Sequence, residues 1–216
     1  MILCLQAAEF CGSGVSVTRP FGVDGPAVRM IDEQFRFPRV HVCVAAIGDS
    51  GEALLIRGLL ESLGASVSLH WVGVPQDLLL VLNDPAPPGR YLILSGHGDA
   101  SGIVFGEYSE DIDTSLLSDG RLPAAALCGK VRLPGRIVIS TACETGSPDF
   151  GRAFVGGGAA AYIAPTGLPD GADAVLFVHR LFHLILTRGL PIDEALRHAR
   201  AYDEESLMFV GYGEAV

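Results

Sequence analysis

The sequence predicts an α/β fold in which helices cover both faces of a mostly parallel β-sheet. Apolar, β-branched runs typical of buried strands alternate along the chain with segments that carry the apolar spacing of helices. The middle strand candidates are apolar throughout, as expected of strands buried on both faces. Of the 216 residues, 49% are hydrophobic and 19% are charged, which is typical of a globular chain and not of a disordered one.

Strands are predicted where β-branched and aromatic residues follow one another between turn residues, beginning with RVHVCVAAI at residues 39–47. The sequence RIVISTAC at 136–143 has the same character. The closing run SLMFVGYG at 206–213 predicts a last strand. Further strands are expected over 65–73, 90–96 and 159–167, with a short hairpin over 101–108.

Helices are predicted between these strands. The segment 48–64 opens with a turn and then places apolar residues at 53, 54, 55, 59 and 60. The longest helix, over 170–189, ends at Gly189, and Pro191 opens the next helix, over 191–203. The remaining helices are expected over 76–84, 123–131 and 149–157.

Residues 1–38 do not share this regular pattern. They mix Gly, Pro and short apolar pieces, as in SGVSVTRPFGVDGP. We expect an N-terminal extension here, either an arm or a hairpin, followed by one domain over 39–216.

Composition excludes several classes of function. A membrane-spanning helix needs about 20 consecutive apolar residues, and no apolar stretch of the sequence comes near this length. The apolar start MILCLQAAEF has no leading Lys or Arg and is interrupted by Glu9, so we expect no signal peptide, no membrane partner and a cytoplasmic protein. The formal net charge of −10 would repel phosphate backbones, so no nucleic-acid partner is expected. The five cysteines are odd in number and lack a CxxC pattern, which favours free thiols.

Two reactive side chains come where predicted strands end. LILSGHG delivers His97 between two glycines, and VISTACETG delivers Cys143. Functional residues of open α/β sheets collect at the carboxyl ends of strands. An imidazole can take the proton of a thiol and later protonate the leaving group, which makes the pair a candidate nucleophile and general acid–base. The backbone N–H groups of Gly98 and Cys143 are candidates for holding an oxyanion.

These motifs resemble the CHAT family, caspase-like cysteine peptidases related to caspases, separases and gingipains. SGHG and ISTACETG carry the resemblance, together with the downstream GGGAAAYIAPTGLPDGADAVLFVHRLFHLILTRGLPIDEALRHAR and the closing LMFVGYG. His97 precedes Cys143 by about 46 residues, close to the caspase offset. The match covers about residues 39–213 and leaves the N-terminal extension outside.

The resemblance implies a three-layer caspase-like sandwich and a cysteine endopeptidase that needs no cofactor and no metal and cleaves a protein or peptide partner. Thr141 stands where caspases carry a pocket-lining glutamine, so a preference for aspartate is not expected. Asp170 or Asp173, after the next strand, would instead favour Arg or Lys at the cleaved position, with Glu144 touching substrate. Glu144 could instead cap or orient its own loop. A separate regulatory protein is expected, and the last strand could pair two copies into a homodimer.

Several alternatives stay open. Asp170 and Asp173 could simply cap the long helix, where the helix dipole favours acids. His179 and His183 lie one turn apart but have no evident third ligand, so a helix-face pair is favoured over a metal site. AIGDSGEALL lacks the lysine of a phosphate loop, which favours an ordinary turn. The whole chain could be a catalytically inactive interaction module, a thiol acyl transferase or a hydrolase of other substrates.

Overall fold

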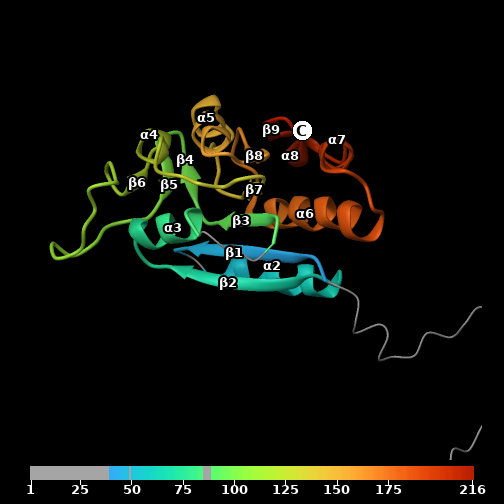
Figure 1. Cartoon of the computed structure of the whole chain (residues 1–216), viewed down its shortest axis with the longest axis horizontal. Helices are drawn as coiled ribbons and strands as arrows, with labels where there is room; N and C mark the ends of the chain where they lie inside the picture. The colour runs from blue at the N-terminus through green and yellow to red at the C-terminus, as the bar shows by residue number, and fades with distance from the viewer. Residues whose placement is uncertain (1–38, 49, 85–88) are drawn as a thin grey trace, which may run out of the picture. The chain divides into compact units, whose positions relative to one another are not determined.

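A six-stranded sheet lies at the centre of the computed structural model, which describes residues 39–48, 50–84 and 89–216 (Figure 1). The first five strands of the sheet are parallel, and the last strand is antiparallel to its neighbour. From one edge to the other, the strands are β2 (Ser66–Val72), β1 (His41–Ile47), β3 (Tyr91–Ser95), β7 (Ile137–Ser140), β8 (Ala161–Pro165) and β9 (Phe209–Tyr212). The predicted N-terminal extension, residues 1–38, lies outside the described residues.

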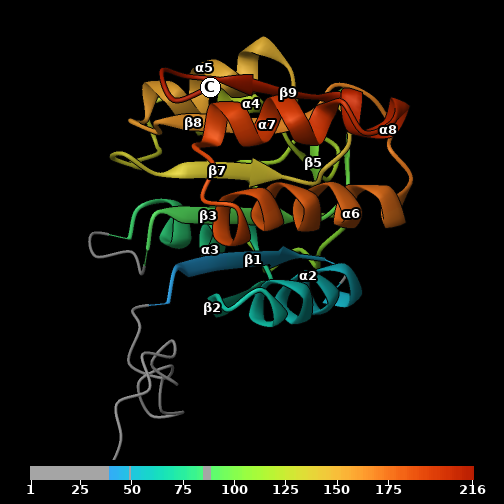
Figure 2. The ribbon, with the colours of Figure 1, turned by 90° about the vertical axis from the view of Figure 1, so that its right-hand side faces the viewer.

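Helices cover both faces of this sheet, as the sequence predicts. Strand β1 is buried on both sides because its residues alternate between two cores: Val42 faces one, and Cys43 faces the other. In Figure 2 one helical layer lies in front of the sheet and the other behind it. The front layer contains α2 (Ser50–Ser62), α6 (Gly171–Phe182) and α7 (Ile192–Arg200), and the back layer contains α3 (Pro75–Leu82), α4 (Ala124–Leu127) and α5 (Pro148–Gly156).

Local sequence sets where these helices begin. Helix α5 starts at Pro148, and the Ser147 hydroxyl before it accepts a hydrogen bond from the Phe150 N–H at 3.4 Å. Helix α3 also starts at a proline, and its Asp77 carboxylate accepts the N–H of Val74 at 3.1 Å. The starts of α5 and α3 are thereby fixed by residues next to them in the sequence.

The structure differs from the predicted elements in several places, and the helix predicted over 123–131 is only four residues long. The long helix ends at Phe182 and continues as a π-helical turn, η1 (His183–Thr187). The helix predicted over 191–203 ends at Arg200, and a further short helix, α8 (Glu204–Leu207), follows because the Asp203 carboxylate accepts the Ser206 N–H at 2.7 Å. The predicted hairpin is part of a separate three-stranded sheet, with β4 (Gly98–Asp99), β5 (Gly102–Val104) and the distant β6 (Arg121–Leu122).

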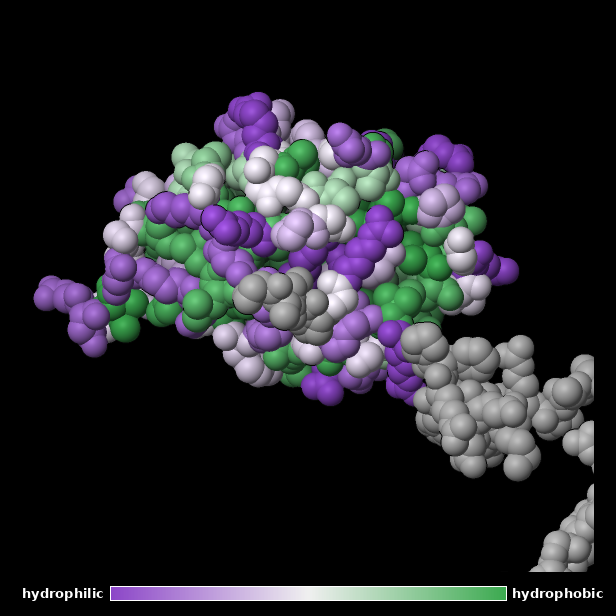
Figure 3. Space-filling view, viewed as in Figure 1, coloured by the Kyte–Doolittle hydropathy of each residue, from purple (hydrophilic) through white to green (hydrophobic). Residues whose placement is uncertain are grey.

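The outer surface mixes polar and apolar side chains. On the face in Figure 3, hydrophobic residues are exposed at several places between hydrophilic ones. Across the described ranges, every helix is too short or too polar to cross a membrane.

Candidate active site

The two loops that carry His97 and Cys143 leave the sheet side by side. Strands β3 and β7 are parallel neighbours, with Leu94 opposite Ser140. One more ladder bond follows, from the Thr141 N–H to the Leu94 carbonyl at 3.0 Å. Because both strands run in the same direction, the loops after them emerge at the same edge, at the centre of the sheet.

The backbones of these two loops touch at Gly98. A Cβ atom on Gly98 would lie 2.4 Å from the Cys143 carbonyl oxygen and 3.0 Å from the Ala142 Cβ. Any residue larger than glycine would therefore push the loops apart. His97 itself is exposed and Cys143 is partly buried. Among the described residues, no hydrogen bond joins the His97 ring to the Cys143 sulfur.

Buried hydroxyl groups hold the loop that carries Cys143. The Ala142 N–H donates to the Ser140 hydroxyl at 3.2 Å, and the Thr145 hydroxyl donates back to the Ala142 carbonyl at 2.7 Å. The two hydroxyls are 3.1 Å apart. From strand β8, the Tyr162 hydroxyl donates to the Thr145 carbonyl at 3.0 Å. These groups are buried, so losing one bond would leave a polar partner unsatisfied away from water.

Glu144 completes the turn in a left-handed conformation, with a φ of 58°. This conformation costs a non-glycine residue about 1–2 kcal/mol. Hydrogen bonds to the end of β8 and to the loop after it hold the turn. The Glu144 N–H donates to the Gly167 carbonyl at 3.0 Å, and the Gly146 N–H donates to the Pro165 carbonyl at 2.7 Å. Strained residues of this kind cluster at functional sites.

The surroundings of the Cys143 thiol favour its protonated form. Burial raises the pKa of this thiol above its ordinary value, although a hydrogen bond with its own backbone N–H opposes that rise. The negative charges of Glu52 and Glu144 raise the pKa further. The sulfur therefore needs a base that removes its proton before it can act as a nucleophile.

Glu52, in the first turn of α2, belongs to the site, although sequence reasoning missed it. Its Oε1 accepts hydrogen bonds from the Ser95 hydroxyl at 2.6 Å and from the Thr141 hydroxyl at 2.5 Å. The available signal was an acid directly after the turn that follows β1, at the same sheet edge as the other candidates. Thr141 is buried, and its side chain faces Glu52.

The acids after β8 lie at the start of α6. Asp170 is exposed, and its side chain makes no capping hydrogen bond, so the side-chain cap considered for it is not formed. Its N–H donates to the Glu205 carboxylate at 3.3 Å. Asp173 is half-buried in the first helical turn. Both follow the strand next to β7, one position along the edge from Cys143.

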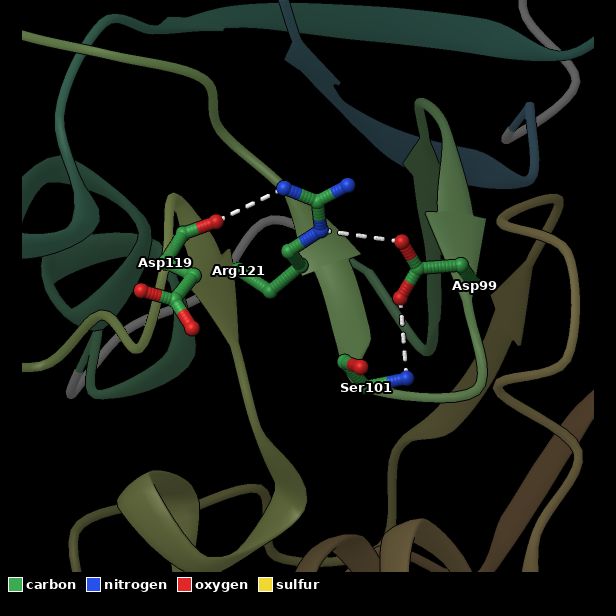
Figure 4. A network of polar contacts seen from close by, with 4 residues as sticks. All are labelled: Asp99, Ser101, Asp119 and Arg121. Atoms are coloured by element: carbon green, nitrogen blue, oxygen red, sulfur yellow. Dashed lines mark hydrogen bonds and ion pairs between the residues drawn. The ribbon is translucent and has the colours of Figure 1, made fainter.

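The His97 loop continues into the small antiparallel sheet, where an ion pair helps to hold it. The Val104 N–H donates to the His97 carbonyl at 2.9 Å. Asp99 pairs with Arg121 at 2.9 Å, and Arg121 also donates to the Asp119 carbonyl at 2.7 Å (Figure 4). The hydrogen bond from Arg121 lowers the pKa of Asp99 most, and the Ser101 N–H lowers it further. A pocket of about 510 Å³ opens beside this sheet, lined by Gly106, Glu107, Tyr108, Thr114, Leu117, Asp119, Gly120 and Arg121.

The other candidate groups lie apart from this edge. His179 and His183 lie near the end of α6 with their ring centroids 6.3 Å apart. Within the described ranges, His, Cys, Asp and Glu side chains form no group of three or more that could hold a metal ion. Cys43 is a buried free thiol and Cys128 an exposed one.

No protein-family model matches the chain, and no curated protein matches it. Among solved structures it is similar to the separase of Saccharomyces cerevisiae in its complex with securin, with 12% sequence identity and a TM-score of 0.50. The match covers 84% of this chain and 13% of the separase chain. At this identity the likeness concerns the fold alone. Together with the six-stranded, mostly parallel sheet between two helical layers, it confirms the prediction that the chain has a caspase-like α/β fold.

Proposed function

We propose that this chain is a cysteine endopeptidase of the caspase-like CHAT group, in which Cys143 is the nucleophile and His97 the general acid–base. The observation that carries the proposal is the contact of Gly98 with the Cys143 carbonyl, because it joins the backbones of the two loops next to these side chains. The exposure of His97 and the partial exposure of Cys143 support it, since a substrate can reach both.

The reaction begins when the His97 imidazole accepts the thiol proton. The Cys143 sulfur attacks the peptide carbonyl carbon, a C–S bond forms, and the carbonyl π electrons move to the oxygen. The N–H groups of Cys143 and Gly98 would stabilise this oxyanion. Among the described residues, the Cys143 N–H donates to no backbone carbonyl, and in the resting protein it interacts with its own thiol. The C–N bond then breaks, and His97 gives its proton to the leaving amine.

The thioester formed in this step is hydrolysed by water. His97 accepts a proton from the water as its oxygen attacks the carbonyl carbon. The C–S bond breaks, the acid product leaves, and the proton returns to the Cys143 sulfur. The turn that holds Cys143 supports both steps, because its buried hydrogen bonds keep the sulfur and the N–H in fixed relation.

The same site is proposed to prefer Arg or Lys at the cleaved position. Glu144 lies beside the nucleophile, and Asp170 and Asp173 begin the helix after the neighbouring strand. The formal net charge of −10 also favours a basic substrate. The similar separase is bound to securin, which supports a protein as the substrate or regulator of this chain.

A homodimer is proposed through β9, which forms one edge of the sheet and pairs only with β8 among the described strands. An edge strand presents unpaired backbone groups to another strand. Size-exclusion chromatography with light scattering should give twice the chain mass, and a monomer at all concentrations would contradict the dimer alone.

Iodoacetamide labelling with peptide mapping tests the catalytic pair. We expect Cys143 to be labelled faster than Cys128, an exposed thiol of the same chain that serves as internal standard. His97→Ala should remove this advantage, whereas His198→Ala on helix α7 should not. If Cys143 is labelled no faster than Cys128, the chain is better described as an inactive interaction module.

A peptide library that varies the residue before the cleaved bond measures activity and preference together. Turnover should be highest for Arg and Lys, should be lost in Cys143→Ala, and should fall about 10²–10⁴-fold in His97→Ala. Cleavage without a basic preference would contradict the pocket assignment only. Absence of cleavage for every peptide would contradict the endopeptidase.

A further inference from the structure

One carboxylate connects the ends of the two strands that carry the proposed catalytic pair. Ser95 lies two residues before His97, and Thr141 lies two residues before Cys143. The hydroxyls of Ser95 and Thr141 donate to the same atom, Oε1 of Glu52, at 2.6 and 2.5 Å. Both hydroxyl residues are buried, with 0% and 3% of their surface exposed. The hydroxyl side of these bonds is therefore shielded from water, while the Glu52 carboxylate is partly exposed.

The connection begins where the sheet ladder ends. The last backbone bond between β3 and β7 runs from the Thr141 N–H to the Leu94 carbonyl. Beyond it, a long contact of 3.4 Å joins the Gly96 N–H to the Thr141 hydroxyl. Hydrogen bonds to an ionised acceptor are shorter and roughly twice as strong as neutral ones. Glu52 therefore supplies the strongest polar link between the two strand ends past the ladder.

Helix α2 fixes the position of this carboxylate. Glu52 lies in the first turn of the helix, where the dipole stabilises a negative charge. The same helix is anchored to the sheet by Ala53, Ile56 and Leu60, which are buried in the front core. The carboxylate is thus held by packing that is independent of the two loops.

We propose that Glu52 is a positioning residue that sets the spacing between the His97 and Cys143 loops. The inference rests on the proposed function, because it concerns the alignment of that pair. A peptidase needs the imidazole and the sulfur within hydrogen-bond reach of one another, and an error of about 1 Å can cost 10²-fold in rate. Glu52 acts on this alignment through Ser95 and Thr141 and does not touch the substrate.

Two substitutions separate the hydrogen bonds of Glu52 from its charge. Glu52→Ala removes the acceptor, and we expect kcat/KM to fall about 100-fold. Glu52→Gln keeps a neutral acceptor of the same shape, and the fall should be only about tenfold. The losses should be equal for peptides with Arg and with a neutral residue before the cleaved bond. Glu61→Gln, at the exposed end of the same helix, is the matched control and should leave turnover unchanged.

The pH profile of Cys143 alkylation distinguishes a change at the site from a general loss of stability. Because the charge of Glu52 raises the pKa of the thiol, Glu52→Gln, which largely keeps the alignment, should shift the profile to lower pH. Glu52→Ala also removes the charge, but the misaligned His97 should cost Cys143 part of its labelling advantage over Cys128. General misfolding would instead change the labelling of the buried Cys43.

Ser95→Ala keeps the inference testable if Glu52→Ala does not fold. This variant removes one hydrogen bond to Glu52, and it should lower turnover about tenfold. Combined with Glu52→Gln, it should cost less than the product of the two single losses, because both act through the same bond. Multiplicative losses would contradict the shared link.

Three results would overturn the inference. Equal losses in Glu52→Gln and Glu52→Ala that are confined to basic peptides would mean that Glu52 pairs with the substrate. Wild-type turnover in Glu52→Ala, together with His97-dependent labelling of Cys143, would reject the positioning role and leave the peptidase intact. A wild-type protein with neither turnover nor His97-dependent labelling would reject the peptidase, and the role of Glu52 with it.

Discussion

The loop after β7 and the loop after β3 are held in different ways. The Cys143 loop is fixed from within by buried hydroxyls of Ser140, Thr145 and Tyr162. The His97 loop is braced at the surface by the Asp99–Arg121 pair, whose side chains are 34% and 40% exposed. One loop therefore depends on bonds that water cannot replace, and the other on a pair that water screens.

This difference implies different tolerance to change. Breaking a buried hydrogen bond leaves an unsatisfied group and costs about 1–3 kcal/mol, whereas an exposed ion pair contributes about 0–1 kcal/mol. For the proposed peptidase, buried bonds hold the loop of the nucleophile, whereas the loop of the base has a buried bond at Ser95 and, beyond His97, a brace at the surface. The loops meet at Gly98, which lies against the Cys143 carbonyl.

The largest effect is expected where the loops touch. In Gly98→Ala, the added Cβ would lie 2.4 Å from the Cys143 carbonyl oxygen, so one loop must move. We expect a loss of about 1–3 kcal/mol in the free energy of unfolding and about 100-fold in peptide turnover. Denaturant unfolding and peptide kinetics measure the two. Gly58→Ala in helix α2, where nothing lies within 4 Å of the new atom, is the control. Unchanged turnover in Gly98→Ala would mean that the alignment does not depend on this contact.

A smaller effect is expected inside the Cys143 loop. Thr145→Val keeps the shape of the side chain but removes the bond to the Ala142 carbonyl. The free energy of unfolding should fall by about 1–3 kcal/mol, because buried polar partners lose their hydrogen bond. The matched control is Thr166→Val, whose exposed hydroxyl also donates to a carbonyl. If both variants lower the free energy of unfolding by the same small amount, burial does not strengthen the Thr145 hydrogen bond.

The smallest effect is expected at the exposed Asp99–Arg121 ion pair. Arg121 lowers the pKa of Asp99 in the folded protein, so the pair stabilises the fold above the unfolded pKa of aspartate. This contribution is lost as the pH falls through the lowered pKa. Asp99→Asn should therefore cost at most about 1 kcal/mol at neutral pH, and the difference from wild type should vanish in strong acid. Thermal unfolding across this range measures it. A difference that grows toward acid would contradict the sign of the linkage.

Much of the fold could be predicted from sequence because its signals are local. Apolar, β-branched runs marked the six strands of the main sheet, and their uniform apolarity indicated burial on both faces. Gly189 and Pro191 correctly separated the last long helices. The pairing of Arg121–Leu122 with the segment after His97 could not be predicted, since two residues carry too little pattern to define a strand. The short α8 was missed for the same reason.

The site was predicted unevenly. His97 and Cys143 stood out because reactive side chains followed apolar strands and were flanked by small residues. Glu52 also follows an apolar strand and a turn of small residues, but an acid in the first turn of a helix is ordinary, and its role appears only through the hydroxyls it binds. Asp170 could be placed at a helix start, but its lack of a capping bond depends on the side-chain conformation.

By itself, the sequence determined the alternation of strands and helices and the two strand ends that carry an imidazole and a thiol, because periodicity and turn residues act over short distances. Only the tertiary structure decided that β3 and β7 are neighbours, that Gly98 contacts Cys143, and that one carboxylate reaches both strand ends. These relations join residues far apart in the chain, and they exist only once the two cores have packed around the sheet.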